Sequence, residues 1–158
     1  MNSKKNMIDI VLASKNQIKF VSDTISGLKK QTFQNYKLIC VDGFSNDGTD
    51  IILKKFDKAN LHYSKNKVEL AYLEGIYHSD SKYIAFSTTS DYYICDHWLE
   101  NAHAILEADD NIDIIWGSGI DISEEGKYLS DNLISAKKAF PNGYRGTIDN
   151  YLLSDFYI

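Results

Sequence analysis

The stretch Val41-Asp42-Gly43-Phe44-Ser45-Asn46-Asp47-Gly48-Thr49 decides the fold, because a strand end, an acidic glycine-containing turn and a helix start follow one another within it. The apolar run 36–41 before it is typical of a buried strand. The two glycines permit a tight or left-handed backbone. Asp47 predicts a helix N-cap, with the helix continuing over 49–56. The stretch therefore predicts a strand–turn–helix unit that places Asp42 at the end of its strand.

The same alternation extends on both sides of this unit. The expected strands are 8–13, 61–63, 83–87 and 112–117, and a hairpin is expected over 120–129 with its turn at Glu124-Glu125-Gly126. The first expected helix carries the series Ile18, Val21, Ile25 and Leu28, and the second covers Val68 to Ser79. A third follows a cap at Asp96 and has the inner face Trp98, Ala102, Ile105 and Leu106, and a fourth covers Thr147 to Leu153. Alternating strands and helices predict an α/β fold, a mostly parallel twisted sheet flanked by helices. Ligands of such sheets bind beyond the carboxyl ends of the strands.

Composition excludes several classes of partner. The 158 residues suffice for one domain, and a net charge of −5 without a Lys/Arg block argues against nucleic acid. A phosphate site in such a chain is expected to use a metal ion or backbone donors. No signal-peptide or membrane-spanning run is found, which favours a cytoplasmic location.

Several kinds of chemistry lack their required residues. Cys40 and Cys95 are expected to be free thiols, and the four histidines form no zinc-binding pattern. No G-x-S-x-G elbow, Walker phosphate loop or G-x-G-x-x-G motif occurs. Triad hydrolysis, P-loop ATP use and Rossmann dehydrogenation are therefore not expected.

Two carboxylates are candidates for ligand binding. Asp42 ends a buried strand beside a glycine and has little apparent structural need to be acidic, so we expect it to accept N–H or O–H groups of a base or ribose. Asp91 ends a run of small hydroxyls and is placed to hold Mg²⁺ or Mn²⁺ bridging two phosphates. The alternative, that Asp91 only caps a turn, stays open, and Asp47 is interpreted as a structural cap.

Four motifs occur in a familiar order: Ala13-Ser14-Lys15-Asn16, then Gln31-Thr32-Phe33, then the turn 41–49, and finally Asp91 followed by Trp98-Leu99. Over about residues 8–120 this order resembles family 2 GT-A-type glycosyltransferases, whose fold is a Rossmann-like nucleotide-diphospho-sugar transferase sheet. The metal aspartate of that family lies eight residues before a leucine, as Asp91 does before Leu99.

The resemblance implies a donor site and a cofactor. The residues that it assigns to nucleotide-sugar binding are Ala13, Ser14, Asn16, Asp42, Thr89, Ser90 and Asp91, with Asp91 on a divalent Mn or Mg ion. Thr89-Ser90-Asp91 stands where the family has its D-x-D element, and Ala71-Tyr72-Leu73 where it has Ala-Arg-Asn. These departures, with Gly43 and Phe44 in the acidic turn, affect the expected metal affinity and donor identity.

The implied function is inverting transfer of a sugar, UDP-linked, to a glycan or lipid-linked acceptor in bacterial surface polysaccharide synthesis. Residues 1–158 are expected to form a single nucleotide-sugar-binding domain, truncated before the acceptor-binding region, with the general base beyond Ile158. Such a chain alone is expected to bind the donor and to transfer poorly or not at all. Peripheral contact with the inner face of a membrane is compatible with this role.

Two other functions remain open. The altered residues Thr89 and Ser90 suggest a non-catalytic nucleotide-sugar-binding module. A receiver-like signalling domain with Asp42 as phosphoacceptor is the third hypothesis. It lacks support because receivers need an early acidic pair, and after the first strand only Ser14 and Asn16 occur.

Overall fold

The computed structural model describes residues 7–65, 67–115, 117 and 119–131. The chain divides into two compact units, Met1–Tyr92 and Tyr93–Ile158. In chain order the elements of the first unit are β1 (Ile8–Ser14), α1 (Val21–Lys30), β2 (Tyr36–Asp42), α2 (Thr49–Lys54), β3 (Ala59–Tyr63), α3 (Val68–Tyr77) and β4 (Tyr83–Thr88). Those of the second unit are α4 (Trp98–Ala108), β5 (Ile120–Ile122) and β6 (Tyr128–Asp131).

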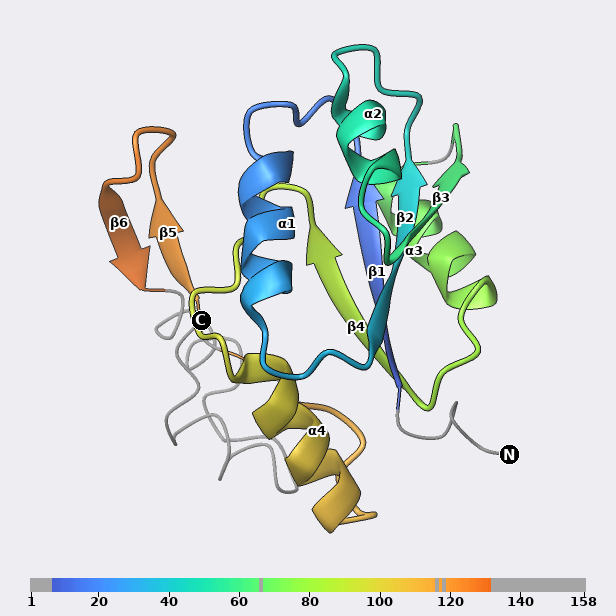
Figure 1. Ribbon diagram of the computed structural model, residues 1–158, viewed down its shortest axis with the longest axis vertical. Coiled ribbons are helices and arrows are strands. Elements are labelled where there is room, and N and C mark those ends of the chain that lie inside the picture. Colours follow the sequence, from blue (N-terminus) through green and yellow to red (C-terminus); the bar gives the residue numbers. More distant parts are fainter. Residues whose placement is uncertain (1–6, 66, 116, 118, 132–158) are drawn as a thin grey trace. The chain divides into compact units, whose positions relative to one another are not determined.

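The strands of the first unit form one parallel sheet in the order β3-β2-β1-β4 (Figure 1). The chain steps from β1 through β2 to β3 and then returns to β4 on the other side of β1. Right-handed connections therefore place α1 and α2 on one face and α3 on the other. Accordingly, α1 packs against α2, and α3 packs against β1 and β2. The predicted α/β fold with a parallel sheet flanked by helices is confirmed.

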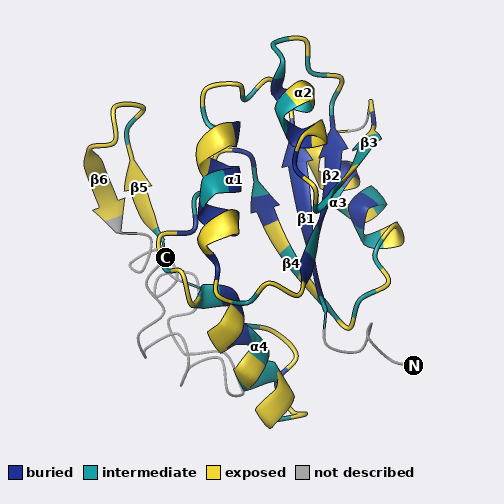
Figure 2. Ribbon diagram, viewed as in Figure 1, coloured by how far each residue is buried: buried dark blue, intermediate teal, exposed yellow. Residues whose placement is uncertain are grey.

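The two central strands form the core of this unit (Figure 2). Every residue of β1 is buried, and so is every residue of β2 except the half-buried Lys37. Parallel strands covered on both faces appear in sequence as continuous apolar runs, which is why these two were predictable. Burial also makes Cys40 chemically inert: desolvation, with a smaller effect of Asp42, raises the pKa of its thiol to about 12. Neither cysteine forms a disulfide among the described residues, in line with the expected thiols.

Small residues let α3 lie close to the sheet. A Cβ atom on Gly75 would stand 2.3 Å from Cγ1 of Val11. One turn earlier in the helix, Ala71 packs against Ala13 and Val41, and the half-buried Tyr72 packs against the same group. Gly75 therefore allows α3 to pack closely against β1.

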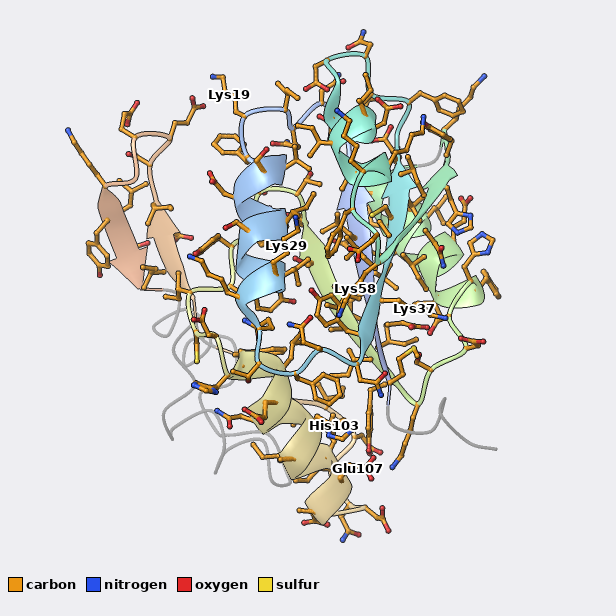
Figure 3. All side chains as sticks on the ribbon, in the orientation of Figure 1. Lys19, Lys29, Lys37, Lys58, His103 and Glu107 are labelled. Carbon is orange, nitrogen blue, oxygen red and sulfur yellow. The ribbon has the colours of Figure 1, made fainter. Side chains whose placement is uncertain are left out.

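A buried carboxylate fastens the amino-terminal edge of the sheet. Asp9 is 0% exposed. Its oxygens accept hydrogen bonds from Ser79 Oγ at 2.7 Å, Asp80 N at 3.1 Å, Ser81 N at 3.3 Å and Ser81 Oγ at 2.7 Å. Nζ of Lys37, labelled in Figure 3, lies 3.6 Å from Asp9 Oδ2 and 2.5 Å from Asp80 Oδ1. These bonds tie the connection between α3 and β4 to the start of β1.

The second unit confirms some predictions and contradicts others. Helix α4 and the hairpin β5–β6 are present, and Gly126 adopts a φ of 77° in the predicted turn. The N-cap of α4 is His97 rather than Asp96; the amide of Trp98 bonds to the carbonyl of Cys95 in a turn that precedes the helix. The strand predicted over 112–117 is wrong for its described residues, since no described strand pairs with them and Ile114 is 57% exposed. The helix predicted over Thr147–Leu153 lies outside the described residues.

Candidate functional site

The carboxyl edge of the sheet brings the predicted site residues together, because all of its strands end there. In the strand register Ser14 pairs with Asp42, and Ala13 pairs with Thr88, the residue before Thr89. Neighbouring strands lie about 4.8 Å apart. The topological switch point, where the strand order changes direction, lies between β1 and β4. Ligands of open parallel sheets bind at such a point.

Asp42 is buried at this edge and has a structural task. It is 0% exposed. Its Oδ1 accepts a hydrogen bond from the amide of Ser45 at 2.7 Å, and its Oδ2 accepts one from the Ser45 hydroxyl at 2.7 Å. The interpretation that Asp42 has little structural need to be acidic is therefore wrong: it closes the turn. A carboxylate offers about four acceptor positions, so two bonds leave positions unfilled; because Asp42 is 0% exposed, a ligand reaches them only when neighbouring groups shift.

Two hydroxyl groups join the loop after β1 to the turn after β2. Ser45 Oγ, which donates to Asp42, accepts the amide of Asn16 at 2.8 Å. Thr49 Oγ1, which donates to Asp47 at 2.7 Å, accepts the amide of Gln17 at 2.8 Å. Both loops at the edge are thus fixed to each other by side chains that link a carboxylate to a backbone amide.

Asn16 and Asp47 complete this clamp. Asn16 has a φ of 50°, and its Oδ1 accepts the amide of Asn46 at 3.0 Å. Asp47 accepts the amides of Ile18 and Thr49, each at 3.0 Å. The bond from the Thr49 hydroxyl, followed by those amides, lowers the pKa of Asp47. The structural interpretation of Asp47 is confirmed, but the N-cap position of α2 is Gly48, one residue later.

Ser14 has a buried hydroxyl at this edge that no described residue bonds to. It is 7% exposed, and its Oγ has no hydrogen-bond partner in the described part of the chain. Its carbonyl accepts the amide of Gly43 at 2.8 Å, so the backbone is held while the hydroxyl remains unsatisfied. A buried hydroxyl without a hydrogen bond is unfavourable by about 1–3 kcal/mol. An unsatisfied donor beside a carboxylate with spare acceptor capacity is an arrangement suited to a polar ligand.

The loop after β4 carries the remaining predicted residues. Thr89 is 1% exposed, and its carbonyl accepts the Thr24 hydroxyl of α1 at 3.0 Å. The Ser90 hydroxyl lies 2.8 Å from that of Thr88. Asp91 is exposed, and its Oδ2 accepts the amide of Thr88 at 2.9 Å. Asp91 therefore closes a turn, as the alternative interpretation required, while its Oδ1 accepts no hydrogen bond from the described residues.

Tyr72 belongs to the segment Ala71-Tyr72-Leu73, which the sequence marked only as a departure from the family's Ala-Arg-Asn. Its hydroxyl donates to the carbonyl of Ser87 at 3.0 Å. Burial, and to a smaller extent the charge of Asp91, raises the pKa of the phenol. Only its spacing of four from Val68 and Ile76 indicated an inward position, and that spacing equally predicts a core residue. The segment Ala71-Tyr72-Leu73 thus keeps one polar group near Asp91.

A family comparison identifies the chain. The model of "Glycosyl transferase family 2" matches residues 9–155. The chain belongs to glycosyl transferase family 2. This membership replaces the receiver-like hypothesis and agrees with the motifs at 13–16 and 41–49.

Solved structures share the fold of this family 2 chain at low sequence identity. S. aureus TarS 1-349 in complex with UDP-GlcNAc has a TM-score of 0.64 and 19% identity, over 72% of this chain and 35% of that one. The mannosyltransferase PcManGT from Pyrobaculum calidifontis, in complex with GDP-Man and Mn²⁺, has a TM-score of 0.60 and 14% identity, over 73% and 35%. These likenesses confirm the GT-A-type fold. The family 2 chain aligns with about a third of the length of each of these proteins.

Two further findings concern the curated proteins and the helices of this chain. No curated protein matches the sequence of the family 2 chain. No helix among the described residues is long and apolar enough to cross a membrane.

Proposed function

We propose that this chain is the donor-binding portion of a glycosyltransferase that takes its sugar from a nucleoside-diphosphate sugar, with UDP as the nucleotide. The observation that carries the proposal is the pair Ser14 and Asp42 at the ends of neighbouring strands. Among the described residues, one is a buried hydroxyl without a hydrogen-bond partner, and the other is a buried carboxylate with unfilled acceptor positions. Family 2 membership, and the UDP-GlcNAc and GDP-Man named for the two similar structures, support it.

The residues at the carboxyl edge contact different parts of the donor. Asp42 accepts an N–H of the base or an O–H of the ribose, and Ser14 bonds to the same part of the nucleotide. Ala13, beside Ser14, lines the pocket, and Asn16 holds the loop through Asn46. Thr89 and Ser90 belong to the loop that borders the diphosphate. A hydrogen bond to a charged group contributes about 1.5–3 kcal/mol, so Asp42 is the strongest single contact.

Asp91 fits a divalent ion whose coordination shell is completed by the substrate. Its carboxylate is exposed, and only its Oδ2 is bonded within the described residues. The described residues contain no group of three His, Cys, Asp or Glu side chains able to hold a metal. Mg²⁺ and related ions commonly use one or two carboxylates, with waters and phosphates as the other ligands. A bound Mn²⁺ or Mg²⁺ supplies charge stabilisation for the departing diphosphate.

The proposed reaction is inverting transfer to a glycan or lipid-linked acceptor during bacterial surface polysaccharide assembly. The acceptor hydroxyl displaces the nucleoside diphosphate directly. The general base is proposed to lie outside the described residues, so the described residues bind and orient the donor. The proposed location of the protein is the cytoplasm, at the inner face of the membrane.

Titration calorimetry with UDP tests the proposal. The full chain should bind UDP more tightly with Mn²⁺ than without it, and Asp91→Asn should abolish the difference. Asp57→Asn, a change of another exposed aspartate in the same unit, is the matched control and should keep the metal effect. Failure of the unaltered chain to bind UDP at millimolar concentration would refute a donor-binding role.

A non-catalytic nucleotide-sugar-binding module is the second candidate. The observation that favours it is that Thr89 and Ser90 put hydroxyls where the family has acidic residues, and that Thr89 is 1% exposed. UDP binding of equal strength with and without Mn²⁺, unaffected by Asp91→Asn, would select this candidate over the enzyme.

A further inference from the structure

Two aromatic side chains form an exposed pair at the carboxyl edge, which we call the aromatic platform (Phe44 and Tyr63). Phe44, in the turn after β2, is 51% exposed, and Tyr63, the last residue of β3, is 39% exposed. Their ring centroids lie 5.4 Å apart at an interplanar angle of 34°. Single exposed aromatic residues are common on protein surfaces. The position and backbone of this pair distinguish it from them.

The backbone at Phe44 is strained. Its φ is 58°, in the left-handed region that a bulky side chain rarely adopts. The turn enforces this conformation on both sides, because Gly43 N donates to the carbonyl of Ser14 and Asp42 binds both the amide and the hydroxyl of Ser45. Burial does not compensate for the strain, since half of the side chain is exposed. Strain of this kind, maintained by surrounding bonds, is concentrated at ligand-binding positions.

The aromatic platform stands next to the proposed donor site. Tyr63 pairs with Asp42 in the register of β3 with β2, and Asp42 pairs with Ser14 in the register of β2 with β1. The platform, the carboxylate and the unsatisfied hydroxyl thus follow one another across three neighbouring strand ends, about 4.8 Å per step. A flat ring whose edge bonds to Asp42 would have the platform beside its face.

The charges around the aromatic platform suit an anionic aromatic ligand. The Tyr63 hydroxyl donates to Asp50 Oδ2 at 2.6 Å, and Lys54 Nζ lies 3.2 Å from the same oxygen, so Tyr63 is held in place. Lys65 Nζ lies 5.8 Å from the centroid of the Phe44 ring. The Lys65 ammonium group supplies a cation for a phosphate, and the exposed Phe44 ring supplies a π-face for a base.

We infer that the aromatic platform is the stacking face for the nucleobase of the donor, an inference that rests on the proposed function. Stacking on aromatic side chains tolerates different bases, because every base has a π-face. The platform should therefore strengthen binding of uracil and guanine nucleotides alike, while the hydrogen bonds of Asp42 discriminate between them. Phe44 is then a positioning and affinity residue of this site.

The test measures dissociation constants for UDP and GDP, with the full chain and its variants Phe44→Leu, Phe44→Ala and Phe44→Tyr. Phe44→Leu keeps an apolar side chain without a ring, and it should weaken both nucleotides by about ten- to 100-fold, as removal of one stacked base contact does. Phe44→Tyr should bind within about threefold of the unaltered chain, because it retains the ring. Tyr77→Ala, a change of an 86% exposed aromatic residue on α3, is the control and should leave both affinities unchanged.

Nuclear magnetic resonance gives a second readout that a merely structural role would not move. The H5 and H6 protons of uracil should shift upfield when UDP binds, because they enter the shielding region of the rings, and the shift should disappear in Phe44→Leu. If UDP binds Phe44→Leu as tightly as the unaltered chain and with the same proton shifts, the stacking inference is overturned while the proposed function stands. If the unaltered chain binds no nucleotide, both fail.

Discussion

Asp9 and Asp42 are two fully buried aspartates that lie on adjacent strands of one sheet, at opposite edges, and they differ in how many partners they have. Asp9, at the amino-terminal edge, accepts four hydrogen bonds from Ser79, Asp80 and Ser81. Asp42, at the carboxyl edge, accepts two, both from Ser45. The two carboxylates are equally hidden from water, so burial alone does not distinguish them.

The number of donors separates a structural carboxylate from one that can still bind. A carboxylate has about four acceptor positions, and a buried one is stable only when hydrogen-bonded. The positions of Asp9 are filled by its own chain. Asp42 keeps unfilled acceptor positions, and the hydroxyl of its register neighbour Ser14 has no hydrogen-bond partner in the part of the chain that the structure describes. The comparison supports the proposal that a ligand binds at the carboxyl edge, and four measurements would break or sharpen it.

The largest effect is expected from Asp9→Ala. The change removes four hydrogen bonds to a buried charge, and we expect the free energy of unfolding to fall by about 4 kcal/mol. Denaturant unfolding measures it. UDP affinity, taken at a temperature where the variant is folded, should stay within about twofold. A loss below about 1 kcal/mol would mean that the bonds to Asp9 are not what fastens the edge.

Asp42→Asn should act mainly on binding. Loss of a charged acceptor is expected to weaken UDP by roughly ten- to 100-fold, with a smaller fall of about 1–2 kcal/mol in the free energy of unfolding. Calorimetry and denaturation on the same sample measure both. Ser45→Ala is the comparison variant: it leaves the carboxylate in place and removes both a bond to Asp42 and the acceptor of the Asn16 amide, so it should lower stability more than UDP affinity. Unchanged UDP affinity in Asp42→Asn would place both aspartates in the structural class.

Ser14→Ala should separate binding from stability more cleanly. Its hydroxyl has no partner among the described residues, so its removal should leave the unfolding free energy unchanged or raise it by up to about 1 kcal/mol. UDP binding should weaken by roughly fivefold, the value of one neutral hydrogen bond. Thermal melting and calorimetry give the two quantities, with Ser22→Ala on the exposed side of α1 as the control. A drop in melting temperature without a change in affinity would reverse this assignment.

The smallest effect concerns Asp47, the aspartate of the same turn that is not buried. Hydrogen bonds from Thr49 and Ile18 lower its pKa in the folded chain. A lowered pKa means that its contribution to stability is present above the unfolded pKa of about 3.9 and disappears as the pH falls through the folded value. The difference in melting temperature between the unaltered chain and Asp47→Asn should therefore shrink from pH 7 to pH 3. A difference that grows toward low pH contradicts the assignment.

The sequence predicted the elements whose burial is visible in their own residue pattern. Strands β1 and β2 were readable because both of their faces are buried, which leaves an unbroken apolar run. The run 112–117 has the same appearance, yet its described residues form no strand, since a run of this kind does not reveal whether a neighbouring strand will pair with it.

The candidate site was predictable only where a local motif marks it. Asp42 and Asp91 follow strands directly, so their edge could be inferred. The donors to Asp9 come from residues about 70 positions later, and no local pattern joins them. The departure at Phe44 was visible, but its left-handed backbone and its contact with Tyr63 required the folded turn. The contact of Tyr72 with Ser87 is equally non-local.

The two hydroxyl links between Asp42, Asp47 and the loop after β1 have a consequence for motion. Three successive amides, those of Asn16, Gln17 and Ile18, each donate to a side-chain oxygen of the other loop. A surface loop usually exchanges its amide hydrogens with water rapidly, whereas these three should exchange slowly despite the exposure of Asn16 and Ile18. A nucleotide bound at this edge as proposed would meet loops that have already lost most of their conformational freedom, so little further ordering entropy would oppose its binding.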